Sequence, residues 1–260
     1  MMRTGHPSQV SSHEIRLAMS FAIGIAPALA LMWLSLRRFD YPIAPKALFD
    51  DRRLFLAFAV GMGFGVFASL LNIYLSLTAT SAGFGPILAL IAIALFEESF
   101  KLVYLNRSGY RGRFDTTFYG VSLALGSAST LVSASGFGLN PSLTGAPETI
   151  ALLIAFSVSM ALILASTGSL IGFGAAQQQS IRYFVRAYLV RLAHLLILFF
   201  FFTGADIILS AGSLAAALVF AAIVYGFVYT EILPETLPRD VRRSLRRWPQ
   251  KSQRPIKESE

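Results

Sequence analysis

Few ionisable residues lie within the apolar segments of this 260-residue chain, and three of them stand close together. Glu97 and Glu98 precede Lys101 by four and three residues, a spacing that places side chains on one face of a helix. Their surroundings are apolar, and an ionisable group in an apolar, membrane-length segment marks a candidate functional site. Two adjacent carboxylates compete for charge, which allows one of them to act as an acid or base.

A histidine and an aspartate extend this set. His194 stands one helical turn after Arg191 in a later apolar segment, and Asp115 stands one turn before Tyr119 at the start of another. The carboxylates lie roughly 11 Å from the end of their segment, and His194 lies at a similar depth from the same side. The set predicts a polar pocket for hydrolysis, in which a glutamate takes a proton from water and His194 stabilises the oxyanion or helps to hold a metal ion.

Each of these residues also has a purely structural interpretation. Glu97, Glu98 and Lys101 form an intrahelical salt-bridge cluster in that case, with the long side chains reaching toward the membrane interface. His194 is then a hydrogen-bonded interior histidine, and Asp115 a first-turn acid favoured by the helix dipole. The cofactor stays unknown, since the candidates do not form a complete set of metal ligands.

The composition excludes most soluble classes of protein. Hydrophobic residues make up 55% of the chain and charged residues 14%, in uninterrupted apolar runs that fit neither a coiled coil, a collagen repeat nor a disordered chain. The chain has no Cys, which excludes disulfides, Cys-ligated zinc, iron–sulfur clusters and thiol nucleophiles. An integral membrane protein is the class that fits.

The elements that must position the candidate residues are apolar stretches long enough to span a membrane. They predict an all-α, polytopic bundle, with a polar segment at 1–16, a transmembrane domain at 17–232 and a basic tail at 233–260. Seven stretches qualify: Leu17–Leu36, Leu54–Thr78, Phe84–Leu105, Phe114–Phe137, Thr149–Ala176, Tyr183–Phe202 and Ile207–Thr230.

The distribution of Lys and Arg predicts the orientation, because positively charged loops stay in the cytoplasm. Nineteen of the 22 basic residues fall in alternate connections and the tail, and the exceptions are Arg3, Arg16 and Lys101. An N-terminus outside and a C-terminus inside follow. The nineteen are Arg37, Arg38, Lys46, Arg52, Arg53, Arg107, Arg111, Arg113, Arg182, Arg186, Arg191, Arg239, Arg242, Arg243, Arg246, Arg247, Lys251, Arg254 and Lys257.

Two other interpretations of the termini fit less well. A cleavage site at Ala28-Leu29-Ala30 conflicts with an apolar run that continues to Leu36 and with a positive cluster after it rather than before it. The tail has only Trp248 as a stacking aromatic, so it favours anionic lipid headgroups over nucleic acid. The Gly61–Gly65 and Gly168–Gly172 stretches have the small-residue spacing of close helix packing.

Two motifs in this order resemble the PrsW family of intramembrane proteases. Glu97-Glu98-Ser99-Phe100-Lys101 is similar to its Glu-Glu-x-x-Lys motif, and Phe114-Asp115-Thr116-Thr117-Phe118-Tyr119-Gly120 is similar to the Asp-containing run that opens its next helix. The resemblance covers roughly 84–202. It implies a helix bundle in a bacterial inner membrane that cleaves membrane or membrane-proximal proteins.

The resemblance assigns the catalytic glutamates to Glu97 and Glu98, the motif lysine to Lys101 and the later histidine to His194. Supporting positions are Asp115 and Tyr119. The sequence departs from the family pattern at two places: Leu131-Val132 stands where a Glu-Asn is expected, and Leu164 where another His is expected.

Three functions are therefore open. The first is a PrsW-like intramembrane endopeptidase that uses glutamate-activated water, with membrane lipids and a membrane-protein substrate as partners. The second is a catalytically inactive PrsW-like scaffold or binding protein, to which the two departures point. A solute transporter ranks last, because the sequence does not show matching halves with interrupted helices.

Overall fold

The computed structural model describes residues 12–40, 44, 48–78, 84–137, 147–202 and 206–243. Every element in these ranges is helical, which confirms the all-α class. The connections between apolar stretches near Ser81, Pro141 and Gly204 lie outside the described residues. So do the basic residues Arg3 and Lys46 and the tail beyond residue 243.

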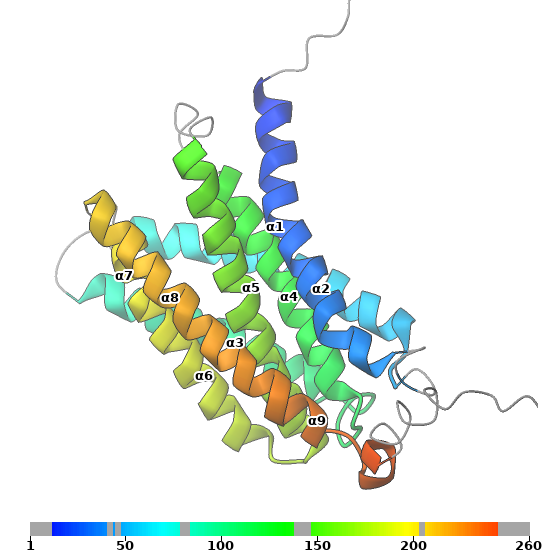
Figure 1. Ribbon diagram of the computed structural model, residues 1–260. Helices are drawn as coiled ribbons and strands as arrows, with labels where there is room; N and C mark the ends of the chain where they lie inside the picture. The colour runs from blue at the N-terminus through cyan, green and yellow to red at the C-terminus, as the bar shows by residue number, and fades with distance from the viewer. Residues whose placement is uncertain are drawn as a thin grey trace, which may run out of the picture.

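Seven of the helices have 18 residues or more (Figure 1). They begin and end within a few residues of the predicted apolar stretches. They are α1 (Ser12–Leu36), α2 (Asp51–Thr78), α3 (Gly85–Leu105), α4 (Thr116–Phe137), α5 (Pro147–Ala176), α6 (Ser180–Ile197) and α8 (Ile207–Phe227). The short elements are a 3-10 turn at Arg37–Phe39, α7 (Phe199–Phe202), a π-helical turn at Val228–Ile232 and α9 (Leu233–Glu235).

Four stretches of the described chain are long and apolar enough to cross a membrane, namely Leu17–Phe39, Asp51–Leu75, Pro147–Ala176 and Ile208–Glu235. They correspond to α1, α2, α5 and α8. Of the other three long helices, α3 carries Glu97, Glu98 and Lys101, and α6 carries three arginines. α4 has no charged residue but is rich in Ser, Thr and Gly.

α4 lies at the centre of the bundle. It packs mainly against α1, α2 and α5, while α5 also contacts α6 and α8, and α3 packs on α6. From Thr116 to Ser133 every described side chain of α4 is buried. Its hydroxyl groups are largely bonded to helix carbonyls, as in the bond from Ser133 to Ser129 O (2.7 Å), so a helix this polar can be buried.

Glycines allow the backbones of these helices to approach closely. A Cβ atom on Gly61 of α2 would collide with the carbonyl oxygen of Leu123 in α4. Gly120 of α4 and Gly168 of α5 lie against each other's carbonyl groups in the same way. The packing role predicted for Gly61 and Gly168 is therefore confirmed, and it explains why the Ser, Thr and Gly of α4 face neighbouring backbones.

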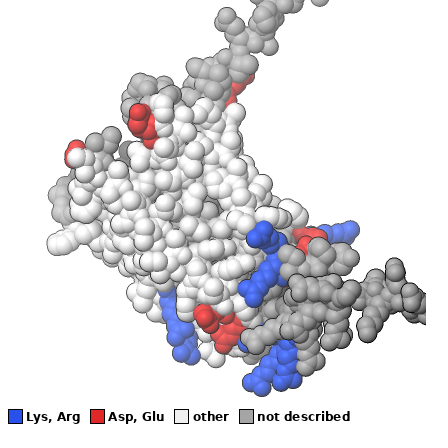
Figure 2. All heavy atoms as spheres, viewed as in Figure 1, with Lys and Arg blue, Asp and Glu red and all other residues white. Residues whose placement is uncertain are grey.

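Charge is distributed unevenly along the bundle. In Figure 2 the visible Lys and Arg side chains lie at one end, and the opposite end shows only acidic side chains. We call the first end the basic end; it holds the connections from α1 to α2, from α3 to α4 and from α5 to α6, together with the end of α8 (Figure 1). At the other end α5 begins with Glu148.

Candidate functional site

Both glutamates of the Glu-Glu-x-x-Lys motif are completely buried, with no exposed surface. Each is paired with a different cation. Lys101 Nζ lies 2.6 Å from Glu98 Oε1, whereas Glu97 Oε2 lies 2.7 Å from Nε of Arg191 in α6. Lys101 and Arg191 are each only 1% exposed, so these pairs are held in the interior and do not extend to an interface.

Of the two ion pairs, only one lies within a single helix, as predicted for the cluster, and the other joins two helices. The i, i+3 pair of Glu98 and Lys101 forms within α3, but Glu97 pairs across helices with Arg191, not with Lys101. The sequence assigns Arg182, Arg186 and Arg191 to the connection after the fifth apolar stretch, but the structure places all three inside α6, where Arg191 is buried. The feature of the sequence that pointed to Arg191 was its position one helical turn before His194.

Three side chains of α5 contact the residues of the cluster. Lys101 Nζ donates to Thr167 Oγ1 at 2.8 Å, and Ser159 Oγ lies 2.9 Å from Nε2 of His194. Met160 Sδ accepts from Arg191 Nη1 at 3.5 Å. Sequence reasoning missed Ser159 and Met160, because a serine or a methionine in an apolar helix usually reports packing.

The contacts of His194 define its protonation state. Arg191 Nη1 lies 3.4 Å from Nδ1 of His194, and a guanidinium can only donate, so Nδ1 is the acceptor. The proton of the neutral ring is then on Nε2, where it donates to Ser159. Arg191 therefore bridges Glu97 and His194, and both ring nitrogens are occupied.

One oxygen of each glutamate has no hydrogen-bond partner. These atoms are Glu97 Oε1 and Glu98 Oε2, both buried. Most buried polar atoms in proteins have partners, so an orphaned carboxylate oxygen in an otherwise paired cluster points to a ligand such as water. The described residues contain no group of three or more His, Asp and Glu side chains arranged to hold a metal ion.

The two departures from the PrsW pattern fall in buried apolar positions. Leu131 and Val132 of α4, and Leu164 of α5, belong to one hydrophobic cluster together with Phe64 and Leu198. Leu164 stands four residues after Met160 and three before Thr167 in α5. Helical spacing therefore places Leu164 on the same face of α5 as Met160 and Thr167, whose side chains contact the charged cluster.

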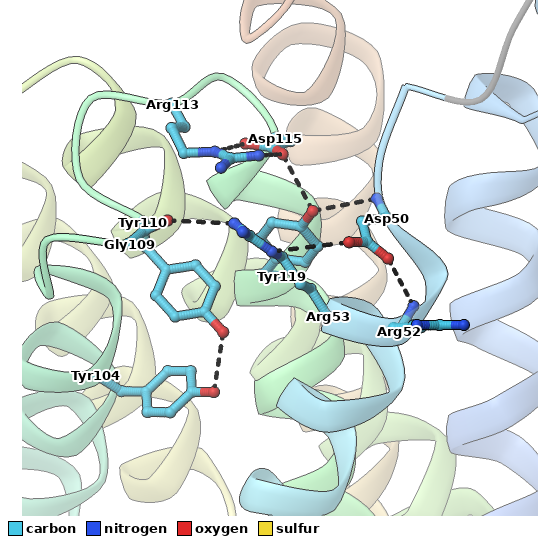
Figure 3. A network of polar contacts seen from close by, with 9 residues as sticks. All are labelled: Asp50, Arg52, Arg53, Tyr104, Gly109, Tyr110, Arg113, Asp115 and Tyr119. Atoms are coloured by element: carbon cyan, nitrogen blue, oxygen red, sulfur yellow. Dashed lines mark hydrogen bonds and ion pairs between the residues drawn. The ribbon is translucent and has the colours of Figure 1, made fainter.

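Asp115 and Tyr119 form a second network at the basic end, separate from the glutamates (Figure 3). The Asp115 carboxylate accepts from Arg113 Nε and Nη2 at 3.0 and 2.6 Å and from the Tyr119 hydroxyl at 3.0 Å. The Tyr119 oxygen also accepts from the backbone N–H of Asp50 at 3.1 Å. This network joins the start of α2, the connection between α3 and α4, and α4 itself.

The carboxylate of Asp115 stabilises the positive charge of Arg113. The hydrogen bond to Asp115 raises the pKa of Arg113, which lies in the connection and is partly exposed. Among the described residues no hydrogen bond or ion pair joins this network to the cluster of Glu97, Glu98 and His194. The predicted site residues therefore fall into two groups.

A search with protein-family models and comparisons with curated proteins and with solved structures found no match to this chain.

Proposed function

We propose that this chain is a polytopic membrane protein of PrsW type that acts as an intramembrane endopeptidase. The observation that carries the proposal is the state of the two buried glutamates: each is held by a cation through one oxygen and has its other oxygen free. A free carboxylate oxygen in a rigid, preorganised cluster is suited to take a proton from a water molecule.

In the proposed reaction, the free carboxylate oxygen of Glu97 or Glu98 takes a proton from a water molecule. The oxygen of that water molecule adds to the scissile carbonyl carbon at the same time. The tetrahedral oxyanion receives a hydrogen bond from Nε2–H of His194, which turns from Ser159. The carboxyl group then returns the proton to the leaving amine as the C–N bond breaks. Lys101 and Arg191 hold the carboxylates in place throughout.

The test is a matched pair of isosteric variants, Glu97→Gln and Glu98→Gln. Glutamine retains an oxygen that accepts from Arg191 or Lys101, but it cannot take a proton from water. New N-termini of membrane proteins are detected by mass spectrometry in cells that express the wild-type chain. We expect them to decrease at least 100-fold in at least one of the two variants. Each single variant leaves one buried cation without its counter-charge, so the N-termini are counted relative to the amount of the chain that accumulates in the membrane.

The control is the charge-balanced double variant Glu98→Gln/Lys101→Gln, which removes both charges of one ion pair. It should accumulate like the wild type, and its cleavage should match that of Glu98→Gln. If no N-terminus depends on either glutamate while all variants accumulate, the endopeptidase proposal is wrong.

A second candidate is a non-catalytic scaffold with the same fold. It is favoured by the one-to-one pairing of the four buried charges and by the apolar positions of Leu131, Val132 and Leu164. On this interpretation the cluster specifies which helices meet, and the glutamine variants lower accumulation without changing any cleavage product.

We further propose seven membrane spans, with the N-terminus outside and the basic end in the cytoplasm of a bacterial inner membrane. The support is the gathering of Lys and Arg at one end of the bundle (Figure 2), since such charges are retained on the cytoplasmic side. The three helices α3, α4 and α6, which carry charged or hydroxyl side chains, span within the bundle, where most of these polar groups have partners.

The absence of Cys makes this topology directly testable. Ser108 lies in the exposed connection after α3, and Glu148 is exposed at the start of α5. A membrane-impermeant maleimide added to intact cells should label Glu148→Cys and should label Ser108→Cys only after lysis. The reverse pattern would invert the proposed orientation, and labelling of both in intact cells would exclude this arrangement of spans.

A further inference from the structure

Three tyrosine rings lead from the helical turn after the buried ion pairs to the network at the basic end. We call Tyr104, Tyr110 and Tyr119 the tyrosine layer. Tyr104 follows Lys101 by three residues in α3, which places it about 4.5 Å nearer to the basic end on the same side of the helix. Tyr104 is 5% exposed and Tyr119 is fully buried.

The three rings contact one another in series (Figure 3). The centroids of Tyr104 and Tyr110 are 5.3 Å apart, and those of Tyr110 and Tyr119 are 5.5 Å apart with an edge-to-face angle of 72°. The hydroxyl groups of Tyr104 and Tyr110 lie 3.1 Å apart. Tyr104 also stacks on Phe100 of α3, so the layer continues along the helix that carries both glutamates.

The members of the layer differ in how they are held. Tyr104 and Tyr119 stand on long helices, but Tyr110 belongs to the connection 106–115 between α3 and α4. Gly112 in this connection has a φ of +79°, a conformation that other residues adopt rarely. Tyr110 is thus the one ring of the three whose position depends on the conformation of a loop.

A small number of bonds holds that loop in place. Arg113 binds Asp115 through two nitrogens, and Thr116 Oγ1 donates to the carbonyl oxygen of Tyr110. Gly112 N–H donates to Ala175 O at the end of α5 (3.0 Å). Two bonds of the loop reach the surface. They are the pair of Arg113 and Asp115, whose Arg113 side chain is 45% exposed, and the longer bond from Arg53 Nη1 to Gly109 O at 3.5 Å (Figure 3).

We propose that the connection 106–115 is a lid over the buried glutamates, with Tyr110 as its moving part. Its latch is the ion pair between Arg113 and the buried Asp115, which the Tyr119 hydroxyl ties to α4. With the latch closed, the tyrosine layer separates the ion pairs from water at the basic end. Release of the latch lets Tyr110 swing away and opens a route to Lys101 and Glu98. The purpose of the route, to admit water and a substrate segment, rests on the proposed function; the lid itself does not.

The lid is tested by the reactivity of a buried thiol, which requires no cleavage activity. Thr167 is fully buried beside Lys101, and Thr167→Cys places one thiol there in a chain that has no other. The probe is 2-(trimethylammonium)ethyl methanethiosulfonate, applied to the full chain in detergent, with the rate measured by intact mass. We expect modification to be at least tenfold faster when Tyr110→Ala or Arg113→Ala is added.

Two controls define the outcome. Tyr183→Ala removes a partly buried tyrosine of α6 that lies outside the tyrosine layer, and it should leave the rate unchanged. Ser108→Cys gives the rate of an exposed thiol. Equal rates in the Tyr110→Ala, Arg113→Ala and Tyr183→Ala backgrounds would overturn the lid, as would a Thr167→Cys rate that already equals the Ser108→Cys rate.

Two further variants keep the experiment decisive if the first ones unfold. Asp115→Asn releases the latch from its other side, and Ser159→Cys is a second reporter beside His194. A protected thiol that the lid variants expose supports the lid even where no cleavage is found. Cleavage that depends on Glu98 together with lid-independent thiol rates would retain the enzyme and reject the lid.

Discussion

Replacing Arg191 with methionine is expected to lower the free energy of unfolding by about 3–5 kcal/mol. The change leaves Glu97 with its carboxylate buried, 0% exposed, and without the cation that lies 2.7 Å from it. It also removes the donor to Nδ1 of His194. An unpaired charge in an apolar interior is among the most destabilising defects known in proteins, so most of the folded protein in the membrane should be lost.

The double variant Glu97→Gln/Arg191→Met tests this reason, because it removes both charges of the pair. It should recover most of the stability lost in Arg191→Met, since replacing a whole buried ion pair by neutral groups is often close to neutral. Arg186→Met is the control, because Arg186 is exposed on the same helix. Its effect should stay within about 1 kcal/mol, the size of its exposed contact with the Tyr183 ring.

The measurement is thermal unfolding of the purified chain in detergent, supported by the amount of folded chain in the membrane. Equal stability of Arg191→Met and Arg186→Met would show that Glu97 and Arg191 do not form the buried pair described above. If the double variant is no more stable than Arg191→Met, the stability lost in Arg191→Met comes from the packing around Arg191 and not from its charge.

Replacing Gly61 with alanine is expected to have the next largest effect, although it adds a single methyl group. The new Cβ atom would collide with the carbonyl oxygen of Leu123, a backbone atom of α4 that cannot rotate away. Relief requires α2 to move from α4, its most extensively packed neighbour. Overpacking of this kind typically costs about 1–3 kcal/mol, and a rigid backbone contact belongs at the upper end of that range.

Gly63 provides a matched control two residues along the same helix. A Cβ atom on Gly63 has no atom within 4 Å, so Gly63→Ala gains the higher helix propensity of alanine without a collision. We expect Gly63→Ala to be neutral or slightly stabilising and Gly61→Ala to lower the unfolding temperature clearly. If the two variants unfold at the same temperature, α2 and α4 do not approach as closely as described.

The positions of the helices were predictable because each depends on a local property of the chain. The apolar runs coincide with α1 to α6 and α8 to within a few residues, and the small residues at Gly61 and Gly168 indicated the faces that pack closely. The separation of Lys and Arg to one end follows from the same pattern, because helices of similar length connected in series place alternate connections together.

The partners of the charged residues were less predictable. Helical spacing indicated that Lys101 could reach either glutamate, and it correctly brought Glu98 and Lys101 together. It could not indicate that Glu97 turns toward Arg191, since 94 residues separate the two. Nor could it indicate that Ser159 contacts His194 and that Thr167 contacts Lys101, because these contacts depend on which face of α5 meets α3 and α6.

By itself the sequence determined that this is an all-α membrane protein with ionisable residues inside its apolar segments, because composition and hydrophobic runs act within one helix at a time. The tertiary structure alone decided that the predicted residues separate into a buried four-charge cluster and a network of Asp115 and Tyr119 at the basic end. That division depends on how the helices rotate and pack against each other. Close contacts between residues distant in the chain set this packing, and a one-dimensional pattern does not contain them.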